Sequence, residues 1–159
     1  MDIELMFSRR PFDEKDLDGF SVITPTQSMT VKLDGKLTNV EIPESFATKN
    51  MLVEIRAGGQ VKSQSYLANS LTVQTIEKYG QLHVVNADSG KPISKAYVKV
   101  YSQSNGQVKF HKDGYTDLRG RFDYVSQSNN PLDGINKYSI LVISPEDGAT
   151  TRQVGRPAE

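Results

Sequence analysis

The chain of 159 residues has no cysteine, no tryptophan and only two histidines. The absence of cysteine excludes disulfides, a thiolate nucleophile and cysteine-ligated zinc or iron–sulfur sites. His83 and His111 are too few for a histidine-rich metal centre. We therefore expect this protein to bind no metal and no cofactor.

An excess of charge of one sign is also missing, because 19 basic residues balance 19 acidic ones. Without a basic cluster, nucleic acid is not expected as a partner. A mean hydropathy of -0.48 and the lack of a long apolar run argue against membrane insertion. Residues 1–7 lack the pattern of a secretory signal. The compartment stays open: extracellular, periplasmic or cell-surface for a fragment of an exported protein, and cytoplasmic otherwise.

Turn-forming pairs are abundant, and they separate short runs rich in Val, Ile, Thr, Tyr and Phe. The pairs, which favour tight hairpins, include Asp34-Gly35, Gly58-Gly59, Asn105-Gly106, Asp113-Gly114, Asp133-Gly134 and Asp147-Gly148. Alternation of apolar and polar residues predicts strands at 20–24, 27–33, 38–42, 51–57, 60–66, 71–77, 80–86, 95–102, 108–113, 121–125, 137–144 and 149–154. The sequence therefore predicts an all-β chain.

Few segments depart from this pattern. Residues 138–143 are apolar on both faces, so we expect a central strand there. Residues 43–47 are the best helical candidate, because Pro43 is tolerated in a first turn. Residues 13–19 are a candidate for one further turn.

The pattern of strands predicts two small antiparallel β-sandwich modules in tandem. We place the first at residues 1–78 and the second at 79–154, with Gly80 as a hinge and 155–159 as a flexible tail. Each module has about 80 residues, which suffices for a sandwich of six or seven strands. The alternative is one continuous all-β domain.

Residues 80–150 carry an ordered set of motifs. A strand at 80–85 is followed by a turn at 88–93, a strand at 96–101, a Thr-Asp turn within 114–122 and a closing strand at 138–144. We expect Thr116 and Asp117 to bond nearby backbone amides, and Gly120 to return the chain into Phe122.

This set resembles the transthyretin-like (prealbumin-like) β-sandwich modules, which include Cna-B-type repeats of bacterial surface proteins and regulatory-type domains of some carboxypeptidases. The resemblance implies that the second module is transthyretin-like and that the parent is a larger bacterial protein. It implies no activity, because the scaffold hosts enzymes, carriers, stalks and adhesins. Residues 1–78 suggest only a generic sandwich, immunoglobulin-like or macroglobulin-like.

Each catalytic or metal-binding pattern that we tested fails. No G-x-S-x-G motif accompanies the histidines, and the C-terminus lacks the short motif of transthyretin-related hydrolases. A Cna-B-type isopeptide bond needs a lysine in 81–86 and an Asn or Asp in 138–143, and neither is there. The acidic residues that cluster in sequence are Asp113, Asp117, Asp123 and Asp133, and their spacing does not fit an EF-hand loop. We therefore expect no enzymatic activity.

A binding surface is the remaining candidate site. Tyr97, Lys99 and Tyr101 alternate with inward-facing small and apolar residues, so they should lie on an outer face, with Tyr115 in a loop nearby. Exposed aromatic rings can contact a partner protein or stack on sugars. The alternative is that these tyrosines cover the edge of the core or contact the first module.

The sequence thus favours a non-enzymatic structural or protein-interaction segment of a larger protein. The expected partner is another protein or another part of the parent polypeptide. Two alternatives stay open, namely a carbohydrate-binding module that uses Tyr97, Tyr101 or Tyr115, and an accessory domain of an enzyme.

Overall fold

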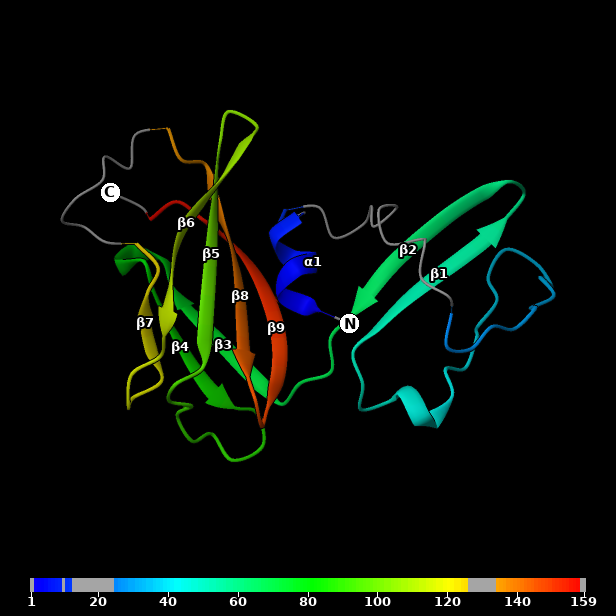
Figure 1. Ribbon diagram of the computed structural model, residues 1–159, viewed down its shortest axis with the longest axis horizontal. Coiled ribbons are helices and arrows are strands. Elements are labelled where there is room, and N and C mark those ends of the chain that lie inside the picture. Colours follow the sequence, from blue (N-terminus) through cyan, green and yellow to red (C-terminus); the bar gives the residue numbers. More distant parts are fainter. Residues whose placement is uncertain (1, 10, 13–24, 126–133, 158–159) are drawn as a thin grey trace. The chain divides into compact units, whose positions relative to one another are not determined.

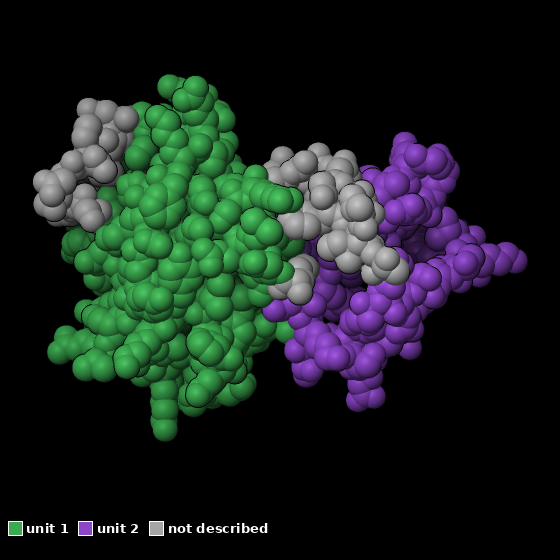
Figure 2. All heavy atoms as spheres, viewed as in Figure 1, with its two compact units in different colours: residues 1–13, 67–159 green, residues 14–66 purple. Residues whose placement is uncertain are grey.

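The computed structural model describes residues 2–9, 11–12, 25–125 and 134–157. The chain forms two compact units, unit 1 of residues 1–13 and 67–159 and unit 2 of residues 14–66 (Figure 2). The described residues contain three antiparallel sheets and a single short α-helix, so the predicted all-β class is confirmed (Figure 1). None of the described helices is long and apolar enough to cross a membrane.

Unit 1 is a sandwich of two antiparallel sheets. Its elements are α1 (Ile3–Arg9), β3 (Leu71–Ile76), the 3-10 helix η3 (Glu77–Tyr79), β4 (Gln81–Asn86), β5 (Tyr97–Ser104), β6 (Gln107–Tyr115), β7 (Arg121–Asp123), β8 (Lys137–Ser144) and β9 (Gly148–Gly155). One sheet has the strand order β3-β4-β7, and the other has the order β6-β5-β8-β9. The core of buried apolar side chains consists of Leu71, Val73, Leu82, Val84, Ala96, Val98, Val100, Tyr124, Val125, Tyr138, Ile140, Val142 and Val154.

The predicted central strand is confirmed, because β8 pairs with β5 on one side and β9 on the other. Ile140 and Val142 face the core, as alternation requires. Leu141 points to the opposite side of the sheet and is nevertheless completely buried. Another part of the chain must therefore cover the outer face of this sheet at Leu141.

The turn between β6 and β7 forms as its residue types predict. The Asp117 carboxylate accepts hydrogen bonds from the backbone N–H groups of Arg119 and Arg121, at 2.8 and 2.9 Å. These bonds, the one from Arg121 foremost, lower the pKa of Asp117. Gly120 has a φ of +71°, and a Cβ there would lie 2.3 Å from the Val84 carbonyl oxygen. The turn therefore needs glycine at this position.

Asp147, in the turn between β8 and β9, connects the two sheets at one end of the sandwich. Its carboxylate accepts hydrogen bonds from Ser144 Oγ at 2.9 Å and from Asn86 Nδ2, at the end of β4, at 2.8 Å. Its backbone oxygen accepts a bond from the Ser70 N–H, immediately before β3. Asp147 thus links the two sheets through polar contacts outside the apolar core.

The described part of unit 2 contains one two-stranded sheet, formed by β1 (Met51–Ala57) and β2 (Gln60–Tyr66) around the Gly58-Gly59 turn. The helical candidate at 43–47 is observed as the 3-10 helix η2 (Glu44–Phe46). The strands predicted at 27–33 and 38–42 do not form, because no described strand pairs with them and a strand needs partners for its backbone groups. The expected strand at 20–24 and turn at 13–19 lie outside the described residues.

The units divide the chain differently from the boundary expected at residue 78. Residues 71–76 form β3, which pairs with β4 along its full length, so residues 67–78 belong to unit 1. Gly80 is packed against Val125 and its carbonyl oxygen accepts the Tyr124 N–H, which is an arrangement unlike the expected hinge. Strand β9 runs to Gly155, the first residue of the expected tail. The pairing of β3 was not visible in the sequence, because strand-like patterns lie on both sides of residue 78.

Candidate functional site

The residues predicted as a binding surface lie together on the outer face of the four-stranded sheet. On β5, Val98 and Val100 face the core while Tyr97, Lys99 and Tyr101 face away from it, as predicted. Tyr115 was expected in a loop but is the last residue of β6, where it pairs with Tyr97. We call Tyr97, Lys99, Tyr101, Phe110 and Tyr115 the aromatic face.

Ring contacts organise the aromatic face into two pairs across β5 and β6. The ring centroids of Tyr97 and Tyr115 are 5.6 Å apart and those of Tyr101 and Phe110 are 5.9 Å apart. The Tyr97 hydroxyl donates to Asp113 Oδ2 at 2.9 Å. Tyr115 is 66% exposed and Phe110 is 53% exposed. Two aromatic side chains on a paired strand are therefore available to a partner.

The other half of the aromatic face is covered by α1. The Phe7 ring meets the Tyr101 ring edge-on with centroids 5.6 Å apart, and the Lys99 ammonium lies 2.9 Å from Glu4 Oε1. The side chain of Lys99 retains only 15% exposure. Met6 and Phe7 are the buried residues of α1. Lys99 and Tyr101 are thus engaged within the chain.

Residues that follow α1 extend this cover over β8 and β9. The Ser139 hydroxyl donates to the Pro11 carbonyl oxygen, and Gln153 Nε2 donates to the Phe12 carbonyl oxygen at 3.3 Å. The Lys137 ammonium lies 5.2 Å from the centre of the Phe12 ring. We call the described residues 2–9 and 11–12 the N-terminal strap. It lies on the face of β8 to which Leu141 points, which explains the burial of Leu141.

The sequence contains signals for α1 beside its strand-like patterns. Asp2 accepts a hydrogen bond from the Leu5 N–H at 3.0 Å, the position that favours Asp at a helix start. Ile3, Met6 and Phe7 follow at the spacing of one helix face, and the latter two are buried. A helix of seven residues gives too short a pattern to separate from a strand by periodicity alone.

Burial and a hydrogen bond favour the protonated form of Tyr97, and a hydrogen bond favours that of Lys99. Burial raises the pKa of Tyr97, and the hydrogen bond to Asp113 raises it further. The hydrogen bond to Glu4 raises the pKa of Lys99, against the opposing effect of burial. At neutral pH both groups are hydrogen-bond donors, so this face is suited to binding rather than to proton transfer.

The aspartates and histidines considered for metal or catalysis have other surroundings. Asp113 accepts from Tyr97, Asp117 holds its own turn, and Asp123 accepts from Gln81 at 2.7 Å. Asp133 lies outside the described residues. Within the described ranges, no group of three or more His, Asp or Glu residues is arranged to hold a metal ion. His83 lies on β4, and the His111 ring on β6 meets the Tyr138 ring edge-on at 5.1 Å.

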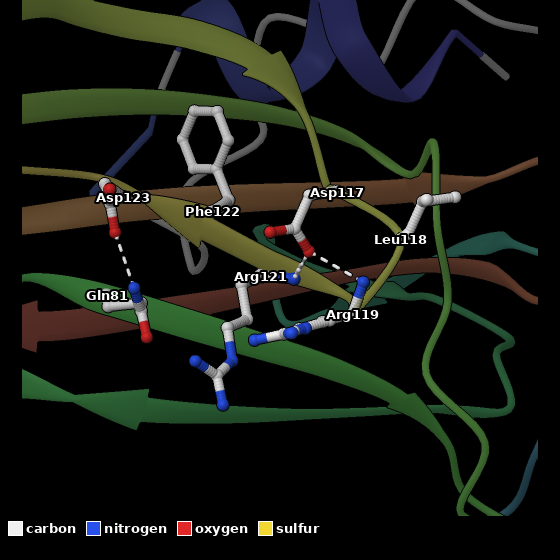
Figure 3. Close-up of a pocket in the computed structure, with 7 residues that line it drawn as sticks. All are labelled: Gln81, Asp117, Leu118, Arg119, Arg121, Phe122 and Asp123. Carbon is white, nitrogen blue, oxygen red and sulfur yellow. Dashed lines mark hydrogen bonds between the residues drawn. The ribbon is translucent and has the colours of Figure 1, made fainter.

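A surface pocket of about 410 Å³ lies beside β7 and contains neither histidine. Its lining residues are Gln81, Asp117, Leu118, Arg119, Arg121, Phe122 and Asp123 (Figure 3). The side chains of Arg119 and Arg121 lie on one side of β7 and the ring of Phe122 points to the other, where it packs against the core. The carboxylates in this pocket are bonded to the turn and to Gln81, so we assign it no chemistry.

Two protein-family models match the chain, one in each half. Residues 70–159 match the model of the AbpF C-terminal domain, and residues 1–53 match that of the AbpF seventh immunoglobulin-like domain. Over 160 aligned residues the chain is 39% identical to actin-binding protein F of Dictyostelium discoideum, covering 99% of this chain and 7% of that protein. The chain therefore corresponds to a small part of the length of this relative.

A solved structure of the rat CD45 extracellular region, domains d3–d4, covers 84% of this chain, and 77% of that structure is covered in turn. Its sequence identity is 13% and its TM-score is 0.26, which is too low to carry a conclusion.

These matches refine the expectations from sequence. They support the expected β-sandwich modules in tandem. They do not support the transthyretin-like, Cna-B-type or carboxypeptidase-regulatory naming of residues 80–150, since the matching models come from the immunoglobulin-like domains of AbpF. The motifs behind that resemblance are turn chemistry and strand alternation, which unrelated sandwiches share. The matches also lend no support to a bacterial parent or to a carbohydrate ligand, because the relative is a Dictyostelium protein named for binding actin.

Proposed function

Because the chain belongs to the family of AbpF C-terminal domains, we propose that it is a non-catalytic segment of an actin-binding polypeptide and contacts filamentous actin through its aromatic face. The name of the Dictyostelium relative supports actin as the partner. The chain spans only 7% of that relative, so actin contact by this particular segment is our proposal.

The observation that carries the proposal is the pair of exposed rings on β6. Tyr115 and Phe110 stand on a strand that is paired along its length with β5, so their positions are set by the sheet. Tyrosine combines a large contact area with a hydroxyl group and dominates the binding energy of many protein interfaces. Figure 1 shows the turn end of the β5–β6 hairpin projecting from the body of unit 1; on β6, Phe110 lies nearer to that end and Tyr115 lies at the opposite end.

The geometry of the rings favours protein over carbohydrate. Sugar rings stack on aromatic platforms, whereas the planes of Tyr97 and Tyr115 are tilted by 54° to each other. The Tyr97 hydroxyl is already bonded to Asp113, and Tyr101 is covered by Phe7. Of the three tyrosines considered for sugar binding, only Tyr115 presents most of its ring to solvent.

Co-sedimentation with filamentous actin tests the proposal. We expect the chain to pellet with filaments, and we expect Tyr115→Ala to weaken binding by about tenfold, the effect of truncating an interface tyrosine by about 1.4 kcal/mol. Tyr79→Ala is the matched control, because Tyr79 is similarly exposed but lies on η3, next to the other sheet. A chain that stays in the supernatant at every filament concentration would contradict direct contact with actin. Equal effects of the two substitutions would contradict the assignment to the aromatic face.

The alternative partner is another part of the same polypeptide, as the sequence also suggested. The long relative and the match of residues 1–53 to a separate immunoglobulin-like domain favour this alternative. It predicts no co-sedimentation of the isolated chain, combined with Tyr115-dependent binding to other segments of the parent protein.

A further inference from the structure

The sheet surface beneath the N-terminal strap has the character of a binding site. It combines an apolar residue, a hydroxyl donor, a cation and a ring, namely Leu141, Ser139, Lys99 and Tyr101. Leu141 is 0% exposed and Ser139 is 1% exposed, although both face away from the core of the sandwich. We call these four residues the covered face.

The strap that fills this face has little structure of its own. A helix of seven residues is too short to be stable in water without packing. Its contacts come from residues far away in the sequence, such as the Lys99–Glu4 bond over 95 positions. Glu4 is 47% exposed, so this ion pair is reachable by solvent and by competing groups. The strap is therefore held on the sheet as a ligand attached through the chain would be, rather than as a permanent part of the sandwich.

The strap and the surface that it covers match different family models. The strap falls within residues 1–53, matched by the model of the seventh immunoglobulin-like domain. The covered face falls within residues 70–159, matched by the model of the C-terminal domain. All residues of both sheets of unit 1 lie in the second range, so the sandwich is complete without the strap.

The row of rings continues beyond the end of the strap. Phe7 contacts Tyr101, and Tyr101 contacts Phe110, which is 53% exposed. Val108 precedes Phe110 by two positions on β6, so it lies on the same face, and it is also exposed. A ligand that repeats the contacts of the strap and adds an apolar side chain over Phe110 would bury more surface than the strap does.

We propose that the covered face is a docking site for a helical segment of another protein, and that the strap is an internal ligand which this segment displaces. The strap defines the chemistry of that segment. It carries a carboxylate for Lys99 and, three residues later, an aromatic ring for Tyr101, the spacing of Glu4 and Phe7. A main-chain carbonyl beyond the helix accepts from Ser139. This inference concerns Lys99 and Tyr101, the half of the aromatic face that α1 covers, whereas the actin proposal rests on the exposed rings of Tyr115 and Phe110; the two proposals share only Phe110.

The test measures binding of a fluorescent peptide with the sequence of residues 2–12 to the full chain by anisotropy. The release variant Met6→Ser/Phe7→Ser loses both buried contacts of the strap, while Leu5→Ser is the control on the exposed side of α1. We expect the peptide to bind the release variant at least about tenfold more tightly than the wild type or the control, because an attached strap lowers the competent fraction. Equal binding to all three chains, or binding to none, would overturn the proposal.

A charge exchange tests recognition of the carboxylate. A peptide with Glu4→Lys should bind the release variant about tenfold more weakly, and Lys99→Glu in the release variant should recover that loss. Weak binding of both peptides to the exchanged chain would overturn the assigned contact.

Hydrogen exchange in the wild-type chain keeps the proposal testable if the release variant fails to fold. We expect amides of α1 to exchange at least about 100-fold faster than those of β5 and β8, because the strap opens without the sandwich. Exchange of α1 only together with these strands would show a permanent structural element and would overturn the proposal. None of these measurements involves actin, so their outcome is separable from that of co-sedimentation.

Discussion

Replacing Thr116 by valine should destabilise unit 1 strongly, although the two side chains are nearly equal in shape. Thr116 is 3% exposed and follows β6 directly. Its Oγ1 accepts a hydrogen bond from the Ala96 N–H at 2.9 Å and donates one to the Ile93 carbonyl oxygen at 2.7 Å. The hydroxyl thus joins the end of β6 to the segment that enters β5.

The cost follows from the two bonds and the burial of their partners. Each lost hydrogen bond contributes about 1 kcal/mol net, and a buried donor left without a partner costs a further ~1–3 kcal/mol. Ala96 is completely buried, so its N–H cannot turn to water. We expect Thr116→Val to lower the free energy of unfolding by about 2–4 kcal/mol, which corresponds to roughly 10–20 °C in Tm for a domain of this size.

Urea denaturation followed by near-ultraviolet circular dichroism measures this loss. The chain has no tryptophan, and Tyr124 and Tyr138 are fully buried in unit 1, so the tyrosine signal reports its packing. Thr72→Val on the outer side of β3 is the matched control and should change stability by less than about 0.5 kcal/mol. A loss below about 1 kcal/mol for Thr116→Val would refute the reasoning that this hydroxyl satisfies a buried amide.

Three further predictions concern the same unfolding transition. The hydroxyl of Tyr138 is buried without a hydrogen-bond partner among the described residues, so Tyr138→Phe should raise the free energy of unfolding by about 1 kcal/mol; a loss of stability would reveal a partner. Gly120→Ala should lower the free energy of unfolding by at least ~2 kcal/mol, because the φ of Gly120 is +71° and an added Cβ would clash with the Val84 carbonyl oxygen. The control Gly106→Ala, where φ is +78° but nothing lies near the added Cβ, should lower it by only about 1 kcal/mol. Burial lowers the pKa of His111 below its ordinary value of 6.5, so the unfolded state binds the proton first as pH falls. The free energy of unfolding of unit 1 should therefore fall as the pH is lowered from about 7, through 6.5, down to the folded-state pKa of His111. Urea titrations at a series of pH values measure this dependence, and His111→Gln should make it weaker.

Strands with a partner close in sequence were predictable, because alternation and turn residues are local properties. Residues 51–57 and 60–66 flank a Gly-Gly turn and form a hairpin as predicted. Residues 27–33 show equally regular alternation and form no strand, with Met29, Val31 and Leu33 exposed. Alternation reports that a segment can present one apolar face, but a strand also needs a neighbour to bond its backbone.

For the candidate site too, one part could be predicted from the sequence and another part could not. The sequence by itself determined that Tyr97, Lys99 and Tyr101 leave the sheet on the side opposite Val98 and Val100, because successive residues of a strand alternate between its faces. Only the tertiary structure decided which of them are available. Glu4 and Phe7 lie more than 90 positions away and cover Lys99 and Tyr101, and no local pattern encodes contact between residues so far apart. Tyr115 stays exposed because the strap crosses β5, β8 and β9, and this path is set by the packing of Met6 and Phe7 on the folded sheet.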